Sequence, residues 1–290
     1  MRRTIAAALL GLTALAAPAR AEEPCAELSG AVDLSRSPRD DRRVFCTFAH
    51  DLVVGSCCQS SLYDCLQKRP DCARARADAL VGLADVAGGG TEESALAAAT
   101  KYEQSLSLAS RQKIDLTGAP CRGQGPVTLA EFSDFDCPHC ALAQGIVDEL
   151  LAARPATRLC VLQFPIHPHS MLAAAAALEA AREGRYWKMA KALFASQAER
   201  EGLGERPYVD ELLQVAKGAG VDPKAVRAAL AGGPALDLAR AQKAEAERLK
   251  LDGTPSFFLD GRPLGVVSLP FFEAAVDDEI ASRKKPPSAK

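Results

Sequence analysis

The stretch Glu131-Phe-Ser-Asp-Phe-Asp-Cys-Pro-His-Cys140 ends in two cysteines that are separated by two residues, and apolar residues lead into it. Downstream, Leu142, Ile146 and Leu150 recur at four-residue intervals, which predicts an amphipathic helix. A strand that delivers a Cys-x-x-Cys pair to the first turn of a helix has the geometry that a reactive dithiol needs. The stretch therefore predicts a redox-active pair of cysteines.

The bulk composition is that of a globular protein with one large or two modest domains. The chain has 290 residues, of which 48% are hydrophobic and 25% charged, and its formal net charge is -2. This near-neutral balance gives no electrostatic reason to expect a nucleic acid or an anionic membrane surface as partner. No motif in the sequence calls for a cofactor or for a bound metal ion at the dithiol.

The N-terminus has the pattern of a secretory signal peptide. Arg2 and Arg3 precede an apolar run over residues 5–17, and small residues follow at Ala19 and Ala21. We therefore expect residues 1–21 to be removed and the mature protein to be periplasmic or secreted. The alternative, an uncleaved membrane anchor, is disfavoured because the run is short for a bilayer span of about 20 residues. All ten cysteines follow this segment, so in an oxidising compartment they should be paired or used for redox chemistry.

Residues 22–112 are predicted to form a small cysteine-rich α-helical domain. Residues 22 to about 45 are polar and predict an irregular, mobile leader. Helical spacing then runs from Ala73 to Ala87, where three glycines end the helix, and Thr91 begins another. Between leader and hairpin lies a dense group of cysteines at Cys46, Cys57, Cys58, Cys65 and Cys72.

This cysteine group has two interpretations. Disulfides would stabilise a unit with few large apolar side chains. Alternatively the thiolates, with His50 nearby, would bind zinc or copper, but their spacing matches no standard zinc pattern and favours disulfides. The count of cysteines allows Cys25 to pair with Cys46. If Cys121 pairs with Cys160, the six N-terminal cysteines can close three bridges of their own. Alternatively Cys160, within the apolar run Leu159–Leu162, is a free buried cysteine, and then some other thiol must be free too.

Residues 113–283 have the order β-α-β, helical block, β-β-α. The expected elements are a strand ending near Phe135, a helix to about Arg154, a strand at 157–164, helices at 172–181, 186–195, 208–217, 223–231 and from Pro234, strands at 256–259 and 263–267, and a final amphipathic helix to about residue 283. The crossover predicts a parallel pair of strands, and the Asp260-Gly261 turn predicts an antiparallel hairpin. The helical insertion covers about residues 167–250, and residues 284–290 are predicted to be a disordered tail.

Over residues 113–283 the chain resembles the DsbA-like branch of the thioredoxin superfamily. Three motifs carry the resemblance in the family's order: Phe132-Ser-Asp-Phe-Asp-Cys-Pro-His-Cys140, Gly184-Arg-Tyr-Trp-Lys-Met-Ala-Lys-Ala-Leu-Phe194 and Gly253-Thr-Pro-Ser-Phe-Phe258. The resemblance implies an α/β fold of thioredoxin type with an inserted helical domain, here preceded by the small cysteine-rich helical domain. It also implies a protein disulfide oxidoreductase with the motif Cys-Pro-His-Cys.

Cys137 is the expected attacking thiol and Cys140 the buried resolving thiol. The N-terminus of a helix favours a thiolate, Pro138 fits its first turn, and His139 can add charge or a hydrogen bond. Two acidic neighbours, at positions 134 and 136, oppose the thiolate, and we expect the helix and His139 to prevail. A stabilised thiolate makes the disulfide form a good oxidant.

Three further site residues follow from the resemblance. Pro255 is expected to be cis, with Thr254 exposing backbone beside the dithiol, where an extended client segment can pair with it. Glu131 matches a buried acid that assists proton transfer to Cys140, although the family's lysine partner has no counterpart that we can identify. A solvated strand face is the alternative for Glu131. His167 and His169 are expected to be loop residues without a catalytic or metal-binding role.

We expect an oxidase that introduces disulfides into exported proteins. The alternatives are an isomerase or reductase with the same site, or a cysteine-rich metal-binding or interaction module on an inactive thioredoxin scaffold. The implied partners are reduced or misfolded exported proteins and a membrane redox partner, DsbB-like or of another type. The oligomeric state stays open.

Overall fold

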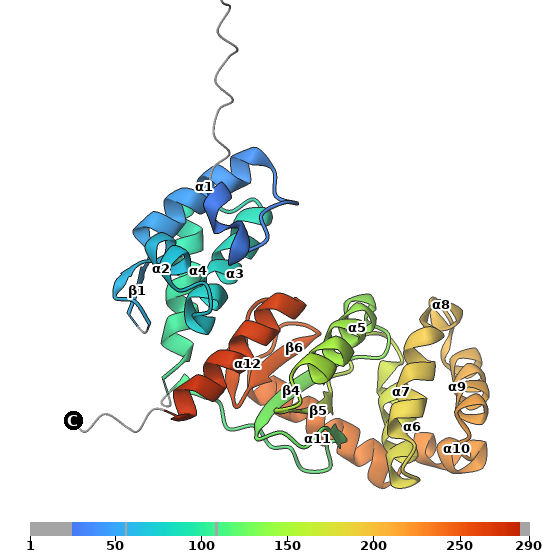
Figure 1. Cartoon of the computed structure of the whole chain (residues 1–290). Coiled ribbons are helices and arrows are strands. Elements are labelled where there is room, and N and C mark those ends of the chain that lie inside the picture. The colour runs from blue at the N-terminus through green and yellow to red at the C-terminus, as the bar shows by residue number, and fades with distance from the viewer. Residues whose placement is uncertain (1–24, 56, 108–109, 285–290) are drawn as a thin grey trace, which may run out of the picture.

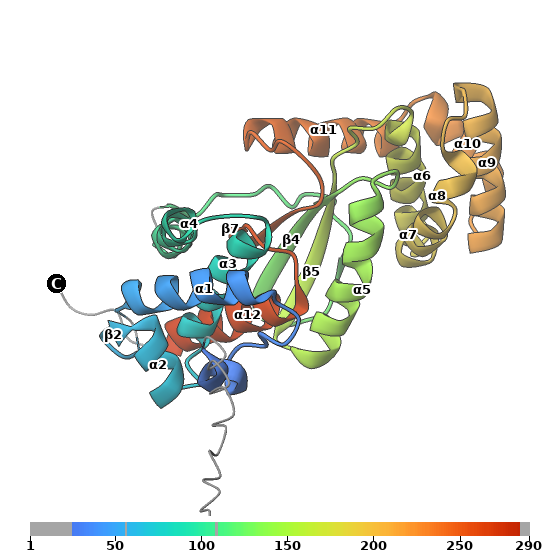
Figure 2. The ribbon, with the colours of Figure 1, turned by 90° about the horizontal axis from the view of Figure 1, so that it is seen from above.

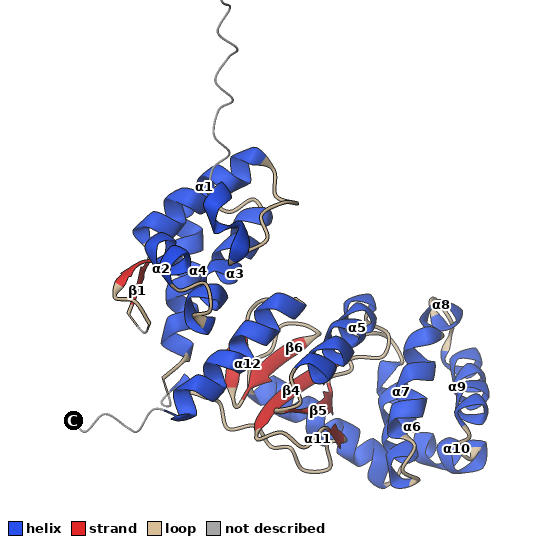
Figure 3. Ribbon diagram, viewed as in Figure 1, coloured by secondary structure: helices blue, strands red, loops and turns tan. Residues whose placement is uncertain are grey.

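The computed structural model describes residues 25–55, 57–107 and 110–284 (Figure 1). The predicted signal peptide and residues 285–290 of the predicted tail lie outside these residues. A mixed sheet occupies the centre, with the N-terminal helices at one end and the helical insertion at the other (Figures 1 and 3). Within the described residues, no helix is both long enough and apolar enough to cross a bilayer.

The central sheet has five strands in the order β3-β5-β4-β6-β7. The middle strand β4 (Val127–Ser133) pairs in parallel with β5 (Thr157–Gln163) and antiparallel with β6 (Ser256–Leu259), which turns back into β7 (Arg262–Leu264). This arrangement confirms the predicted parallel pair and the hairpin. The short strand β3 (Cys121–Arg122) pairs antiparallel with β5 and was not predicted, because two residues give no periodic signal.

Helices cover both faces of the sheet, so β4 is buried on both sides. Helices α5 (Pro138–Ala153) and α12 (Leu269–Lys284) lie on one face, and α11 (Pro234–Arg248) crosses the other (Figure 2). Successive β4 residues point to opposite faces. Leu129 joins the core on the α5 side and Phe132 joins the smaller core on the α11 side. Glu131 therefore lies on the α5 side, among apolar residues.

The helical insertion is organised around the alanine-rich helix α6 (Ser170–Arg182), which contacts four other helices. Its small side chains allow close packing, and most of them are fully buried. The other helices are α7 (Tyr186–Ala195), α8 (Gln197–Arg200), α9 (Glu205–Ala219), α10 (Pro223–Ala231) and α11. Helices α7 and α10 have the predicted bounds, whereas the four-residue α8 was not predicted.

The N-terminal region contains four α-helices among the described residues. They are α1 (Arg39–Asp51), α2 (Leu62–Lys68), α3 (Ala73–Ala87) and α4 (Glu92–Ser105), with a 3-10 helix at Ala26–Gly30 and short strands β1 (Val53–Val54) and β2 (Ser60–Ser61). The predicted irregular leader to residue 45 is wrong, because α1 begins at Arg39. Phe45 and Phe48 lie on one buried face of α1, which stabilises the helix despite its many charges.

Three disulfides close this region, and they join Cys25 to Cys46, Cys57 to Cys72, and Cys58 to Cys65. The prediction of disulfides is confirmed, and these cysteines are not available as metal ligands in this state. A fourth disulfide joins Cys121 to Cys160 across β3 and β5, which decides between the two alternatives left open for Cys160.

The N-terminal helices pack on the last helix, α12 (Figures 1 and 2). Tyr102 of α4 lies edge-on to Phe271 of α12, with ring centroids 5.6 Å apart, and both residues belong to the large core. Arg74 forms ion pairs with Asp278 of α12 and with Glu103 of α4. The boundary predicted between residues 112 and 113 falls in the connection from α4 to β3 and stays a prediction.

Candidate active site

Both cysteines of the dithiol lie at the N-terminus of α5. Cys137 is the residue that caps the helix, Pro138 occupies the first helical position, and Cys140 lies in the first turn. Both cysteines are free thiols. The side chain of His139 is exposed, whereas Cys137 is only 4% exposed and Cys140 is fully buried. The first turn therefore holds one thiol just beneath the surface and one in the interior.

The cis-proline segment lies against Cys137. The peptide bond between Thr254 and Pro255 is cis, as predicted. The Cys137 thiol donates a hydrogen bond to the carbonyl oxygen of Thr254 at 3.3 Å, although 117 positions separate the two residues. This places a backbone acceptor of a half-buried residue immediately beside the thiol.

Cys140 is held in an apolar environment. Its Sγ accepts a hydrogen bond from the backbone N–H of Asp134 at 3.4 Å. Burial raises the pKa of the Cys140 thiol well above its usual value, because the thiolate loses hydration there. At neutral pH a free Cys140 thus keeps its proton, and it needs a base when it is to attack.

Glu131 is fully buried and faces α5, so the alternative of a solvated strand face is wrong. Gln144 of α5 donates from Nε2 to Oε1 of Glu131 at 3.2 Å, so the partner of this carboxyl is an amide. Burial raises the pKa of Glu131 to about 7, and the hydroxyl of Ser133 lowers the pKa of both Glu131 and Cys140 in part. The Ser133 hydroxyl, whose Oγ has no hydrogen-bond partner among the described residues, lies close to both the Glu131 carboxyl and the buried thiol.

Asp134 is bound by the loop that follows β5. Its Oδ2 accepts from the backbone N–H groups of Ile166 and His167 at 2.7 and 3.0 Å, and from the hydroxyl of Ser170 at 3.1 Å. The Nδ1 atom of His167 lies 2.8 Å from the same oxygen. His167 was expected to be a loop residue without a role in the site. The structure instead brings it to the active-site loop, residues 134–137.

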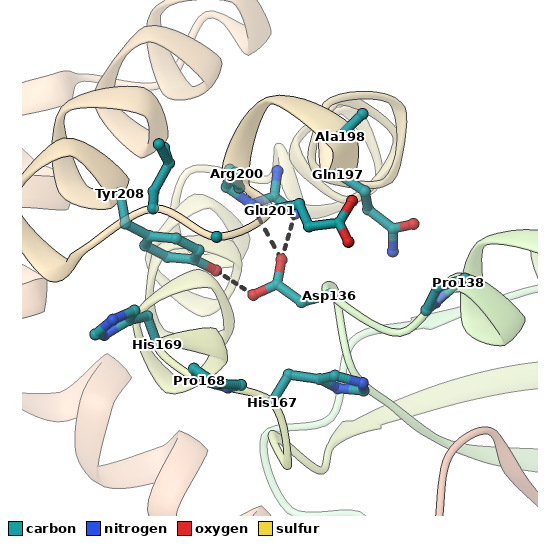
Figure 4. Close-up of a pocket in the computed structure, with 12 residues that line it drawn as sticks. Asp136, Pro138, His167, Pro168, His169, Gln197, Ala198, Arg200, Glu201 and Tyr208 are labelled. Carbon is teal, nitrogen blue, oxygen red and sulfur yellow. Dashed lines mark hydrogen bonds and ion pairs between the residues drawn. The ribbon is translucent and has the colours of Figure 1, made fainter.

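Asp136 is bound by the helical insertion (Figure 4). Its Oδ1 accepts from Nη2 and Nε of Arg200 at 2.8 and 3.1 Å, and its Oδ2 accepts from the Tyr208 hydroxyl at 2.5 Å. Arg200 is buried and also donates to the carbonyl oxygen of Phe135 at 3.1 Å. The negative charge expected to oppose the thiolate is therefore paired with a guanidinium.

Gln197 of α8 completes these contacts. Its Nε2 donates to the carbonyl oxygens of Phe135 and Cys137 at 2.7 and 3.0 Å. Sequence reasoning missed Gln197, Arg200 and Tyr208, which lie 60 to 72 positions after their partners. The only signal was an acidic residue beside a dithiol, which requires a cation somewhere in the fold.

A cleft of about 660 Å³ opens beside the dithiol, between the active-site loop and the helical insertion. Asp136 and Pro138 line it at the thiol end, Gln197 and Glu201 on the side of the insertion, and His167 on the side of the β5 loop (Figure 4). No group of three or more potential metal-ligating side chains occurs among the described residues. The cleft is therefore bordered by polar side chains directly next to Cys137.

Comparison with known proteins supports this assignment of the fold. A family model described as thioredoxin matches residues 122–278, which is more than half of the chain. The Na(+)/H(+) antiporter NhaA 3 of Salinispora tropica is 33% identical over 168 residues, which are 57% of this chain and 25% of that protein. NhaA 1 of Mycolicibacterium gilvum is 30% identical over 145 residues, which are 49% of this chain and 23% of that protein. The chain spans about a quarter of the length of these curated relatives.

Solved structures show the same fold. Wolbachia pipientis α-DsbA1 aligns with a TM-score of 0.51 and 17% identity, over 58% of this chain and 94% of that one. BdbD of Bacillus subtilis aligns with a TM-score of 0.50 and 19% identity, over 60% of this chain and 96% of that one. By the family match, which covers the dithiol and the cis-proline segment, the chain belongs to the thioredoxin family.

Proposed function

We propose that this protein is an exported oxidase that introduces disulfides into reduced proteins of the periplasm or the secreted fraction. The observation that carries the proposal is the contrast between the two thiols of one helical turn. Cys137 caps α5 beside the backbone of Thr254, whereas Cys140 is buried and has a raised pKa. This asymmetry suits Cys137 to bond with a client and Cys140 to act within the protein.

The reaction would proceed in two exchanges. A client thiolate attacks Sγ of Cys137 in the Cys137–Cys140 disulfide, so that a mixed disulfide forms and Cys140 leaves and takes up a proton. A second client thiolate then attacks the client sulfur of the mixed disulfide, which releases Cys137 as a thiolate. Two electrons pass from the client to the dithiol. A membrane redox partner, DsbB-like or of another type, would remove them again.

The direction of exchange depends on how well Cys137 leaves as a thiolate. The N-terminus of α5 favours negative charge at this position. Because Arg200 pairs with Asp136, the nearest carboxylate opposes this effect less than the sequence suggested. A stabilised Cys137 thiolate favours the reduced enzyme and the oxidised client.

Glu131 is proposed to carry the proton for Cys140. A carboxyl with a pKa of about 7 can both accept and donate a proton near neutral pH, and Ser133 lies beside both groups. When Cys140 leaves, protonated Glu131 supplies the proton. When reduced Cys140 attacks a mixed disulfide, ionised Glu131 accepts it.

Client binding is proposed to involve the backbone next to Pro255. The Thr254 carbonyl lies 3.3 Å from the Cys137 thiol, so an extended client segment that pairs there brings its cysteine to the site. Main-chain pairing of this kind tolerates many sequences, which suits an enzyme that acts on many clients.

The redox potential of the Cys137–Cys140 pair tests the proposal. We expect a potential at or above about -180 mV in glutathione equilibrium, with fast oxidation of a reduced, unfolded protein. A potential near the -270 mV or so that is typical of thioredoxin would contradict the oxidase and favour a reductase. Faster recovery of a scrambled substrate than of a reduced one would favour the isomerase. Cys137→Ser and Cys140→Ala are the inactive controls, and full turnover in both would exclude this dithiol.

A further inference from the structure

The cleft beside Cys137 has the chemistry of a subsite for one client side chain. We propose that it binds the arginine or lysine that neighbours the reacting cysteine of a client. This inference rests on the proposed exchange at Cys137. It adds a preference among clients that the main-chain pairing at Thr254 does not give.

The position of the cleft suits a residue adjacent to the client cysteine. Asp136 and Pro138, which directly flank Cys137 in the chain, both line the cleft. Gln197, another lining residue, donates to the carbonyl oxygen of Cys137 at 3.0 Å. Successive Cα atoms of a client lie 3.8 Å apart, so a long side chain one or two residues from the client cysteine can enter the cleft.

The charges of the lining residues favour a cation. Two carboxylates, Asp136 and Glu201, face one guanidinium, that of Arg200, with the lining histidines His167 and His169 counted as neutral. Arg200 is 2% exposed and donates to Asp136, Phe135 and two carbonyl oxygens of the insertion, so it is not available to a ligand. Glu201 is exposed and forms no ion pair with the described residues, and its side chain extends toward Gln197 (Figure 4). One negative charge in the cleft is therefore uncompensated.

Two of the polar atoms that remain free in the cleft can accept a hydrogen bond. Gln197 uses its Nε2 for two backbone carbonyl oxygens, which leaves its amide oxygen for a ligand. His167 contacts Asp134 through Nδ1, which leaves Nε2. An arginine brings five N–H donors and a lysine three, and both match a set of acceptors with a net negative charge. A client glutamate would instead meet the charges of Glu201 and Asp136.

The test compares three dithiol peptides that differ only in the residue next to the cysteine, which is arginine, alanine or glutamate. We expect kcat/KM for oxidation to fall in this order, by about threefold overall from the arginine to the glutamate peptide at low salt, with a smaller ratio at high salt. Glu201→Lys should reverse the order. The matched control is Glu199→Lys, because Glu199 is exposed on α8, two residues before Glu201, but does not line the cleft.

A second readout separates this proposal from the proposed oxidase. In the Cys140→Ala protein, Cys137 is first converted to its mixed disulfide with glutathione, and single-cysteine versions of the arginine and glutamate peptides then compete to displace glutathione as the leaving thiol. Mass spectrometry gives the ratio of the two peptide adducts on Cys137. Arginine also changes the reactivity of the peptide's own thiol, whichever protein it meets. The arginine/glutamate ratio of the Cys140→Ala protein is therefore divided by the arginine/glutamate ratio of the Glu201→Lys, Cys140→Ala protein.

The two readouts fail in different ways. We expect a quotient of about ten. Glu201→Lys replaces attraction by repulsion for the arginine peptide and repulsion by attraction for the glutamate peptide. A quotient near one overturns the cleft proposal, even if oxidation of all three peptides is fast. A quotient near ten without net oxidation of any peptide retains the cleft and refutes the oxidase.

Discussion

Replacement of Arg200 by methionine should both destabilise the protein and make its dithiol less oxidising. The guanidinium joins Asp136 and Phe135 of the active-site loop to α7 and α8 of the insertion, and its side chain is 1% exposed. Methionine retains much of the aliphatic bulk but removes every one of these hydrogen bonds. The Asp136 side chain is 15% exposed, so its charge stays largely buried and loses its cation.

The magnitude follows from the cost of an unpaired buried charge. Removal of one partner of a buried ion pair costs about 3–5 kcal/mol, and we take about 3 kcal/mol because Asp136 is partly hydrated. For a chain of this size that corresponds to a fall in Tm of about 6–12 °C. With Asp136 uncompensated next to Cys137, the thiolate is less favourable. A tenfold loss in the equilibrium constant lowers the reduction potential by about 30 mV.

Thermal denaturation and glutathione equilibrium measure the two effects separately. Asp136→Asn in the Arg200→Met background should restore most of the potential but only part of the Tm, because Phe135 and Leu193 still lack their donor. Arg227→Met is the control, since Arg227 and Asp210 are an exposed pair in the same insertion and should leave Tm within about 1 °C. An Arg200→Met protein with unchanged Tm and unchanged potential would refute the reasoning.

Three other substitutions probe the remaining buried groups. Folding raises the pKa of Glu131 from 4.5 to about 7, so the native state holds more protons than the unfolded state and the free energy of unfolding falls by up to about 3 kcal/mol as pH rises through this window. Glu131→Gln should remove this pH dependence of the free energy of unfolding in urea between pH 4.5 and 7, and an unchanged dependence would contradict the assignment. Burial raises the pKa of Asp78 well above its usual value, so its ionisation also lowers stability as pH rises. Asp78→Asn should therefore raise Tm at about pH 7.5 by a few degrees, whereas a lower Tm would show that Arg74 compensates the charge. The Cys121–Cys160 disulfide closes a sequence separation of 39, so replacement of both cysteines by alanine should cost about 4 kcal/mol in chemical denaturation, with Cys137–Cys140 turnover retained as the control that the site is intact.

Sequence patterns predicted the elements that have their own periodic signal. Helices such as α3 and α10 and the pairing of β4 with β5 follow from apolar spacing and from the crossover rule. Helix α1 was missed because its charged first turns conceal the buried pair Phe45 and Phe48. The four-residue α8 and the two-residue β3 are too short for any periodicity, and tertiary contacts alone define them.

The same limit applies to the candidate site. The positions of Cys137, Cys140 and Glu131 follow from one contiguous motif, and Pro255 follows from the family pattern. Arg200 and His167 carry no local signal, because each is selected by a carboxylate that lies far away in the chain. A buried carboxylate beside a thiol implies that compensating groups exist, but only the fold can say which ones they are.

The two aspartates of the active-site loop affect the Cys137 thiolate less in the structure than the sequence suggested. In isolation, Asp134 and Asp136 are charges that oppose the Cys137 thiolate. In the fold, Asp134 is bound by the loop between β5 and α6, and Asp136 is bound by α8 and α9. The residues that compensate the two charges therefore also attach the active-site loop to the helical insertion at two places, the loop before α6 and the segment of α8 and α9. A change that shifts α8 relative to the sheet must break the pair of Asp136 with Arg200, and so must alter the environment of Cys137.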